Sequence, residues 1–175
     1  MSHALVYLRP SRIAFVRATG PYETSIPDAW AQMNDWINRN GYGGLVHRGY
    51  GMCRDNPMRV DPATCRYDAC IELLPQFDER AARELNVATL PGGSYARRRY
   101  SGPYAALRAE LAGIHASFEP SAGLKLDDRR PLVAIYLENP SRVEAQDLRA
   151  DICIPVVAIT SRDVIRDKAD VSNAA

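Results

Sequence analysis

Short alternating apolar runs and one run with a helical period predict the elements of the first half of the chain. Residues 12–19 form a β-favourable run ended by a Gly-Pro pair, which predicts a strand. A helix is expected over 25–40, with Gly41 at its C-cap. Its apolar residues keep the i, i+3, i+4 spacing of one buried stripe: Ile26, Trp30, Met33 and Ile37. Two more strands are expected, at about 45–54 and 65–73.

The second half repeats this order of elements. A strand is expected at 94–101 and a helix at 105–118, with Gly123 closing the helix. The helix again carries one apolar stripe, formed by Leu107, Leu111, Ile114 and Phe118. The last two strands are expected at 132–137 and 148–156. Each half is therefore predicted to run strand, helix, strand, strand.

Matching peptides recur at a nearly constant spacing in the two halves. Gly20-Pro21-Tyr22 returns as Gly102-Pro103-Tyr104, 82 residues later (102 − 20). Two further matches lie 83 residues apart (138 − 55 and 151 − 68): Asp55-Asn56-Pro57 with Glu138-Asn139-Pro140, and Asp68-Ala69-Cys70-Ile71 with Asp151-Ile152-Cys153-Ile154. This register indicates a tandem duplication, with copies at about 12–75 and 92–156.

The pattern predicts an α+β fold, built as a tandem duplication of a βαββ unit. We expect antiparallel sheets and two main helices around a ligand cavity, because duplicated units often form a pocket where the copies meet. A chain of 175 residues can bury one core. We therefore expect a single domain over 1–159, followed by a polar C-terminal tail over 160–175.

Composition narrows the class of protein. The 22 Lys and Arg nearly balance the 21 Asp and Glu, so we expect no direct binding to nucleic acid. The chain has no run of about 18 apolar residues and no apolar secretory signal at its start, so no membrane association is expected. The four cysteines form no Cys-x-x-Cys pair. We therefore expect no metal and no cofactor, and favour reduced, buried thiols in a cytoplasmic protein.

Six peptides, taken in order, resemble the GyrI-like small-molecule-binding domain. They are Arg-Ala-Thr-Gly-Pro-Tyr (17–22), Asp-Asn-Pro (55–57), Cys-Arg-Tyr-Asp-Ala-Cys-Ile-Glu (65–72), Leu-Pro-Gly-Gly-Ser-Tyr-Ala (90–96), Tyr-Leu-Glu-Asn-Pro (136–140) and Ile-Pro-Val (154–156). The resemblance covers about 12–157. The same module is the effector-binding domain of AraC-type and MerR-type regulators, and it implies the tandem βαββ fold.

The resemblance implies ligand binding rather than a defined reaction. Such domains bind hydrophobic, often cationic, small molecules in a cavity between sheet and helices, and in multidomain relatives the cavity controls a DNA-binding head. Here eleven residues precede the first expected strand, too few for a helix-turn-helix. We therefore expect a free-standing form. Some stand-alone relatives sequester toxins or protect gyrase, and a subgroup hydrolyses reactive cyclopropane-bearing natural products.

One position departs from the family pattern. Members commonly carry a cavity-facing Glu two residues before the Tyr of the Tyr-Leu-x-x-Pro motif, as counter-ion for a cation or as an acid–base group. Here that position is Ala134. The absence of a buried carboxylate weakens the case for cation selection and for hydrolysis. A hypothesis from strand spacing is that Glu72 or Asp68 replaces it.

Strand alternation nominates the candidate ligand contacts. If position 134 faces the cavity, so does Tyr136, whose counterpart in the first copy is Cys53 (136 − 53 = 83). In the third strand of the first copy, the more polar face alternates carboxylates with a cysteine, and this face returns in the second copy. The candidate set is Tyr136, Glu72, Asp68, Cys70, Cys153, Cys53 and Tyr104. No catalytic residue and no metal ligand is assigned.

Structural roles compete with these assignments. We favour packing over ligand stacking for Tyr104, and core positions over pocket positions for Trp30 and Trp36. Asp68 suits a structural hydrogen bond as well as a ligand contact. Cys53 is expected to be an inert buried thiol rather than a reactive one. The arginines at 97–99 are expected on a solvated strand edge.

Three functions remain open from the sequence. The first is a stand-alone binding protein for a hydrophobic small molecule, used in sensing or sequestration and linked to transcription regulation or gyrase inhibition. The second is a hydrolase of reactive cyclopropane-bearing natural products, for which Glu72 and Tyr136 are the one carboxylate–hydroxyl pair we nominate. The third is a protein-interaction module whose partner is gyrase or a regulator.

Overall fold

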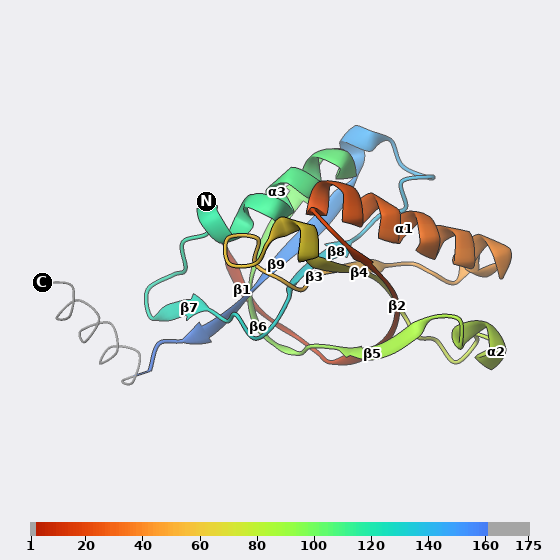
Figure 1. The fold of residues 1–175 in the computed structure, drawn as a ribbon, viewed down its shortest axis with the longest axis horizontal. Coiled ribbons are helices and arrows are strands. Elements are labelled where there is room, and N and C mark those ends of the chain that lie inside the picture. The colour runs from red at the N-terminus through yellow and green to blue at the C-terminus, as the bar shows by residue number, and fades with distance from the viewer. Residues whose placement is uncertain (1–2, 161–175) are drawn as a thin grey trace, which may run out of the picture.

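A computed structural model describes residues 3–160 of the chain. Within this part, nine strands and three α-helices form an α+β fold (Figure 1). Apart from Thr160, the expected polar tail over 160–175 lies outside the described residues. No helix in the described part combines the length and the apolar content that crossing a membrane requires.

The elements follow the predicted order, with additions. The α-helices are α1 (Tyr22–Arg39), α2 (Glu79–Ala82) and α3 (Tyr104–Ser117). The strands are β1 (Ala4–Leu8), β2 (Ser11–Thr19), β3 (Gly49–Cys53), β4 (Arg66–Glu72), β5 (Asn86–Leu90), β6 (Gly93–Ser101), β7 (Leu124–Leu126), β8 (Leu132–Tyr136) and β9 (Arg149–Ala158). The two expected helices and six expected strands are confirmed. The sequence patterns missed β1, β5, β7 and the four-residue α2.

Helix α1 begins three residues earlier than expected, directly after Pro21. The ring of Pro27 lies inside the helix and supplies no N–H, so the carbonyl of Glu23 lacks its usual intrahelical donor. A guanidinium nitrogen of Arg108, on α3, donates to that carbonyl at 3.4 Å. Gly41 has the left-handed φ of 71° at the end of α1, which confirms its predicted capping position.

The predicted role of Gly123 is wrong. Helix α3 ends at Ser117, and Phe118 is already extended. Pro120 follows closely, and the residue before a proline avoids the helical conformation. Gly123 instead takes its positive φ of 82° in the turn that precedes β7.

All nine described strands join one curled antiparallel sheet. Its order is β1-β6-β9-β8-β3-β4-β2-β5, with β7 added on β9, and every pairing is antiparallel. Strands β1 and β2 are nearly continuous, as are β5 and β6, and β1 pairs with β6 while β2 pairs with β5. These two broken strands curl the sheet round on itself, and α1 and α3 lie together on its outer side (Figure 1).

Strand β6 lies inside the sheet, between β1 and β9. The expectation that the arginines at 97–99 lie on a sheet edge is therefore wrong: the unpredicted β1 pairs with β6 as far as Arg97, and β9 pairs with all three arginines on the other side. Arg99 donates to Asp151 at 2.5 Å, and Arg97 lies 3.8 Å from the same carboxylate. Arg98 points the other way and pairs with Glu110.

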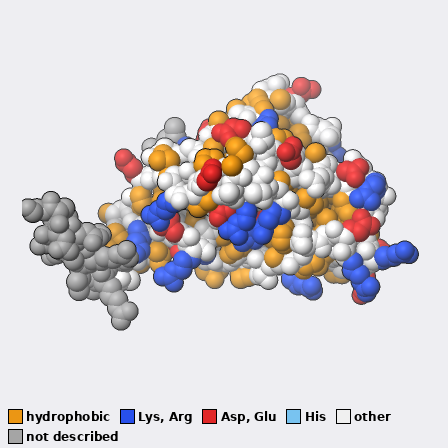
Figure 2. All heavy atoms as spheres, in the orientation of Figure 1, with side chains coloured by type: hydrophobic (Ala, Val, Ile, Leu, Met, Phe, Trp, Pro, Cys, Tyr) orange, Lys and Arg blue, Asp and Glu red, His pale blue; other side chains and the backbone are white. Residues whose placement is uncertain are grey.

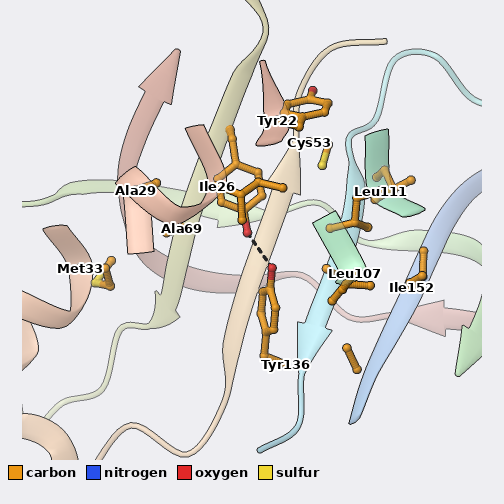
Figure 3. Packing of buried hydrophobic residues seen from close by; sticks show 14 of the residues in the cluster. Tyr22, Ile26, Ala29, Met33, Cys53, Ala69, Leu107, Leu111, Tyr136 and Ile152 are labelled. Carbon is orange, nitrogen blue, oxygen red and sulfur yellow. Dashed lines mark hydrogen bonds between the residues drawn. The ribbon is translucent and has the colours of Figure 1, made fainter. Parts of the chain in front are cut away.

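The sheet separates two apolar cores. The larger core fills the space between the sheet and the two long helices, and includes Met33, Trp36, Leu107 and Leu111 (Figure 3). The smaller core lies inside the curl of the sheet, and consists of Ile13, Met52, Cys70, Leu90, Tyr95, Val133 and Cys153. Alternate residues of β3, β4, β8 and β9 therefore serve different cores.

The two halves place corresponding residues in corresponding contacts. Strands β3 and β8 are paired so that their central residues, Gly51 and Ala134, lie opposite each other. The hydroxyl of Tyr22 accepts from the backbone N–H of Asp55 at 3.1 Å, as that of Tyr104 does from Glu138 at 3.3 Å. Both pairs keep the spacing of the matched peptides. The tandem duplication itself stays a prediction from the sequence.

Gly113 offers a test of helix α3. A Cβ added at this position would meet nothing within 4 Å outside the helix's own backbone. We expect Gly113→Ala to raise the free energy of unfolding by about 0.4–1 kcal/mol, because alanine restricts the unfolded chain and favours helix. Urea denaturation of both proteins measures the change. An equal or lower midpoint would mean that the exposed face of α3 needs glycine there.

Candidate functional site

A cleft of about 520 Å³ opens between one side of α1, from Ile26 to Asn38, and the N-terminal part of α3, next to the end of β8. Its walls come from α1, α3 and two loops, at 43–48 and 138–141. Figure 2 shows basic and acidic side chains interspersed over the face that it draws. Such a volume falls in the usual range for small-molecule sites.

Three aromatic side chains line the cleft. Tyr136, at the end of β8, is 9% exposed, whereas Trp30 on α1 and Tyr104 at the start of α3 are half-buried. The ring of Tyr136 lies edge-on to both of the others, at centroid distances of 5.2 Å from Trp30 and 4.9 Å from Tyr104. Contacts of this geometry hold the rings in place while leaving apolar surface open to the cleft.

Two glycines in β3 make room for this aromatic floor. A Cβ on Gly49 would stand 2.4 Å from the ring of Trp30, and one on Gly51 would stand 2.1 Å from the hydroxyl of Tyr67. Neither side chain could keep its position beside any other residue type. Glycine inside a strand often marks such a close approach.

A hydrogen-bonded chain runs beneath the cleft. The indole Nε1 of Trp30 donates to the hydroxyl of Tyr67 at 2.9 Å, and the hydroxyls of Tyr67 and Tyr136 share a bond of 3.0 Å (Figure 3). Burial raises the pKa of both tyrosines, so both hydroxyls keep their protons at neutral pH. Three N–H and O–H donors therefore serve two bonds, and one hydroxyl proton is left over.

The proton left over belongs on Tyr136. Tyr67 is fully buried, and its hydroxyl already accepts from Trp30. If Tyr67 donates to Tyr136, the O–H that remains belongs to Tyr136, a residue that lines the cleft. The opposite arrangement would leave a buried donor unsatisfied, which costs about 1–3 kcal/mol.

Tyr104 has no such donor to spare. Its hydroxyl donates to the carbonyl of Arg149 at 2.7 Å and accepts from the backbone N–H of Glu138. The carboxylate of Glu138 is also engaged, because the guanidinium and the backbone N–H of Arg149 both donate to it at 2.7 Å. Tyr104 therefore offers the cleft ring surface alone, and Glu138 contributes a neutralised charge.

Five of the seven predicted contacts do not line the cleft with Tyr136, and four of them lie on the other face of the sheet. Asp68, Cys70 and Cys153 lie on the inner face of the curled sheet, opposite the helices, because they alternate with the residues that face the helices. Glu72 is on the same inner face, exposed beside a smaller hollow of about 240 Å³ that Tyr50 also borders. The expectation that this polar face lines the cavity of Tyr136 is wrong for that geometric reason.

Asp68 has a structural environment. Its carboxylate is fully buried and accepts from Arg17 at 2.6 and 2.9 Å and from Arg54 at 2.7 Å. These three bonds occupy the carboxylate, so it is not available as a counter-ion in the cleft. This arrangement fits the structural hydrogen bond that was the alternative to a ligand contact for Asp68.

The predicted cysteines are buried thiols. Cys53 faces the helices, as its register with Tyr136 implies, but it is 1% exposed in the larger core and does not line the cleft. Burial raises the pKa of Cys53, and it raises the pKa of Cys153 to about 12. Both thiols therefore stay protonated and unreactive at neutral pH.

Trp30, Arg48 and Arg108 line the cleft but were not nominated as ligand contacts. Trp30 packs against the larger core, as expected, but it also lines the cleft. Trp36 is in the core, 2% exposed, and donates to the carbonyl of Ala81 at 3.1 Å. Helical spacing places both tryptophans near the same stripe and cannot separate them. The sequence feature that distinguishes Trp30 is the pair of glycines in β3, because glycine leaves room for a large ring against the sheet.

Comparisons with known proteins bear on the family and the fold of the chain. The family model of the GyrI-like small molecule binding domain matches residues 1–157. Over 165 residues the chain is 25% identical to a DNA gyrase inhibitor of Cronobacter sakazakii, a match that covers 89% of this chain and 97% of that protein. Two solved structures share the fold. SAV2435 bound to tetraphenylphosphonium has a TM-score of 0.59 at 14% identity, covering 90% of this chain and 94% of that one. The EcmrR C-terminal domain has a TM-score of 0.60 at 12% identity, with coverages of 90% and 98%.

Proposed function

Because the chain belongs to the GyrI-like small-molecule-binding domain family, we propose that the cleft between α1 and α3 binds a hydrophobic small molecule, for sensing or sequestration. The observation that carries this proposal is the aromatic lining, formed by Trp30, Tyr104 and Tyr136 around about 520 Å³. Rigid rings with one spare hydroxyl donor suit an apolar ligand that has a polar acceptor group.

We also propose that the cleft is a product of the duplication. Helix α1 belongs to the first predicted copy, and α3 and β8 belong to the second. The copies differ where the cleft forms, because Tyr136 corresponds to Cys53 and Tyr67 corresponds to Ala150 (150 − 67 = 83). Each copy therefore supplies one tyrosine of the Tyr67–Tyr136 hydrogen bond, and the site needs both copies.

Removing the indole of Trp30 tests the proposed site. We expect Trp30→Ala to weaken binding of para-biphenylcarboxamide, a neutral aromatic probe, by at least about tenfold, because a packed ring contributes on the order of 1.4 kcal/mol or more. Isothermal titration calorimetry gives the dissociation constant for each protein.

The other tryptophan provides the control. Trp36→Phe alters the core on the far side of α1 from the cleft, so it should lower the melting temperature but leave the dissociation constant of the probe unchanged. Equal affinity of wild type and Trp30→Ala would place the binding site elsewhere. Wild-type protein that binds no biphenyl probe would refute small-molecule binding of this kind.

A protein partner is the second candidate function, favoured by the similarity to a protein named as a gyrase inhibitor. Capture of gyrase by wild type and by Trp30→Ala alike would support a surface that does not use the cleft. The hydrolase alternative lacks its nominated pair, since Glu72 and Tyr136 lie on opposite faces of the sheet.

A further inference from the structure

We propose that the cleft selects hydrophobic anions, and in particular aromatic or amphipathic carboxylates, over hydrophobic cations. This inference rests on the proposed function, since it names the class of ligand for the same cleft. Three features carry it: the charges at the rim, the donor at the floor, and the small residues beneath it.

The charges that line the cleft favour an anion. Arg108 on α3 and Arg48 before β3 both line the cleft, and Arg48 also borders the smaller hollow beside Glu72, where it interacts with the hydroxyl of Tyr50. Arg108 has one long bond, of 3.4 Å, to a backbone carbonyl. The carboxylate that lines the cleft, on Glu138, is already paired with Arg149. The rim therefore carries positive charge that a ligand can neutralise.

The floor of the cleft offers a donor. Tyr136 is nine-tenths buried and holds the O–H that the chain of Trp30 and Tyr67 leaves over. A carboxylate or another acceptor oxygen satisfies this hydroxyl, whereas an ammonium group, which only donates, does not. The same atom thus favours acceptors and disfavours cations.

No negative charge lies beneath the aromatic floor. Ala134 and Gly51 face each other across β8 and β3, and both are buried. A desolvated cation needs a carboxylate in contact with it, because burying an unpaired charge is costly. In this cleft a cation would gain contact with aromatic rings, but it would also meet two arginines and a carboxylate already bound to a third arginine.

Three probes with one skeleton test the preference: para-biphenylcarboxylate, its neutral carboxamide, and para-biphenylmethylammonium. We expect the carboxylate to bind about tenfold more tightly than the ammonium, and its affinity to fall as salt rises. Arg108→Met should weaken the carboxylate about three- to tenfold and leave the carboxamide unchanged. Tyr136→Phe should weaken both acceptor probes and spare the ammonium.

Arg83→Met is the matched control, because Arg83 is 81% exposed beside α2, away from the cleft. It should leave all three dissociation constants unchanged. If the ammonium binds most tightly, or if Arg108→Met weakens all three probes equally, the anion preference is refuted while the cleft remains a binding site. If none of the probes binds, the proposed function fails together with the preference.

Discussion

Replacing Asp68 by asparagine is expected to lower the free energy of unfolding by about 2–4 kcal/mol. The carboxylate is fully buried, and three charge-assisted hydrogen bonds from Arg17 and Arg54 compensate for its desolvation. Breaking a buried ion pair leaves the remaining charges uncompensated. We place the loss toward the lower end because the arginine side chains are 36% and 23% exposed and keep part of their hydration.

Urea denaturation measures this loss, with Asp35→Asn as the control. Asp35 also bonds an arginine, at 2.9 Å, but its side chain is 67% exposed, so its replacement should leave the unfolding midpoint unchanged within error. Folded Asp68→Asn should bind para-biphenylcarboxamide as wild type does, because Asp68 lies on the other face of the sheet. A stable variant that no longer binds would return Asp68 to the list of ligand contacts.

Replacing Gly51 by alanine is expected to cost about 1–3 kcal/mol of stability and to weaken binding in the cleft. The new Cβ would stand 2.1 Å from the hydroxyl and 2.8 Å from the ring carbon of Tyr67, so Tyr67 must move. Overpacking of this kind has costs in that range. Because Tyr67 joins Trp30 to Tyr136, its displacement also disturbs the floor of the cleft.

Two comparisons separate this cause from a general effect of losing glycine. At Gly44 an added Cβ would meet nothing within 4 Å, so Gly44→Ala should change the unfolding free energy little. In a double-mutant cycle, Tyr67→Phe removes the atom nearest to the new methyl group, so Gly51→Ala should cost less in that background. Equal costs in both backgrounds would show that the strain lies elsewhere.

Local periodicity was sufficient to predict the long elements and the order in which they occur. The stripe that includes Met33 and Ile37 predicted α1. Both long helices begin at the tyrosine of a matched Gly-Pro-Tyr peptide, earlier than the starts predicted at 25 and 105. The spacing of 83 residues also agrees with the pairing of β3 with β8, in which Gly49 meets Tyr136 and Cys53 meets Leu132. These features are local or repeated, so a single sequence contains them.

Long-range closure was not predictable from the same patterns. Strand β1 is apolar at every position, with Leu5 62% and Tyr7 68% exposed beside the partly buried Val6 and Leu8, so its sequence lacks the polar–apolar alternation that marks a half-buried strand. Its partner, β6, lies about ninety positions further on, at Ala4 opposite Arg97. The sequence near residue 4 does not indicate such a partner, and the sequence patterns therefore predict an edge position for the arginines of β6.

The sequence patterns also could not predict on which face of the sheet the cleft lies. Alternation correctly separated the Asp68 face from the Ala69 face, but it could not tell which of the two the helices cover. The presence of carboxylates on one face suggested polar ligand contacts. In the structure Asp68 on β4 forms ion pairs with Arg17 on β2 and with Arg54 directly after β3. Such a pairing depends on tertiary packing.

The curled sheet has a consequence for how the chain folds. The pairing of β1 with β6 and of β3 with β8 joins residues that are far apart in sequence, so the contact order is high, and small domains of this kind fold in about milliseconds to seconds. During synthesis the first half emerges before β6, β8 and β9 exist. Strand β3 and the apolar β1 then remain with unpaired edges in the nascent chain, and the curled sheet closes only late in translation.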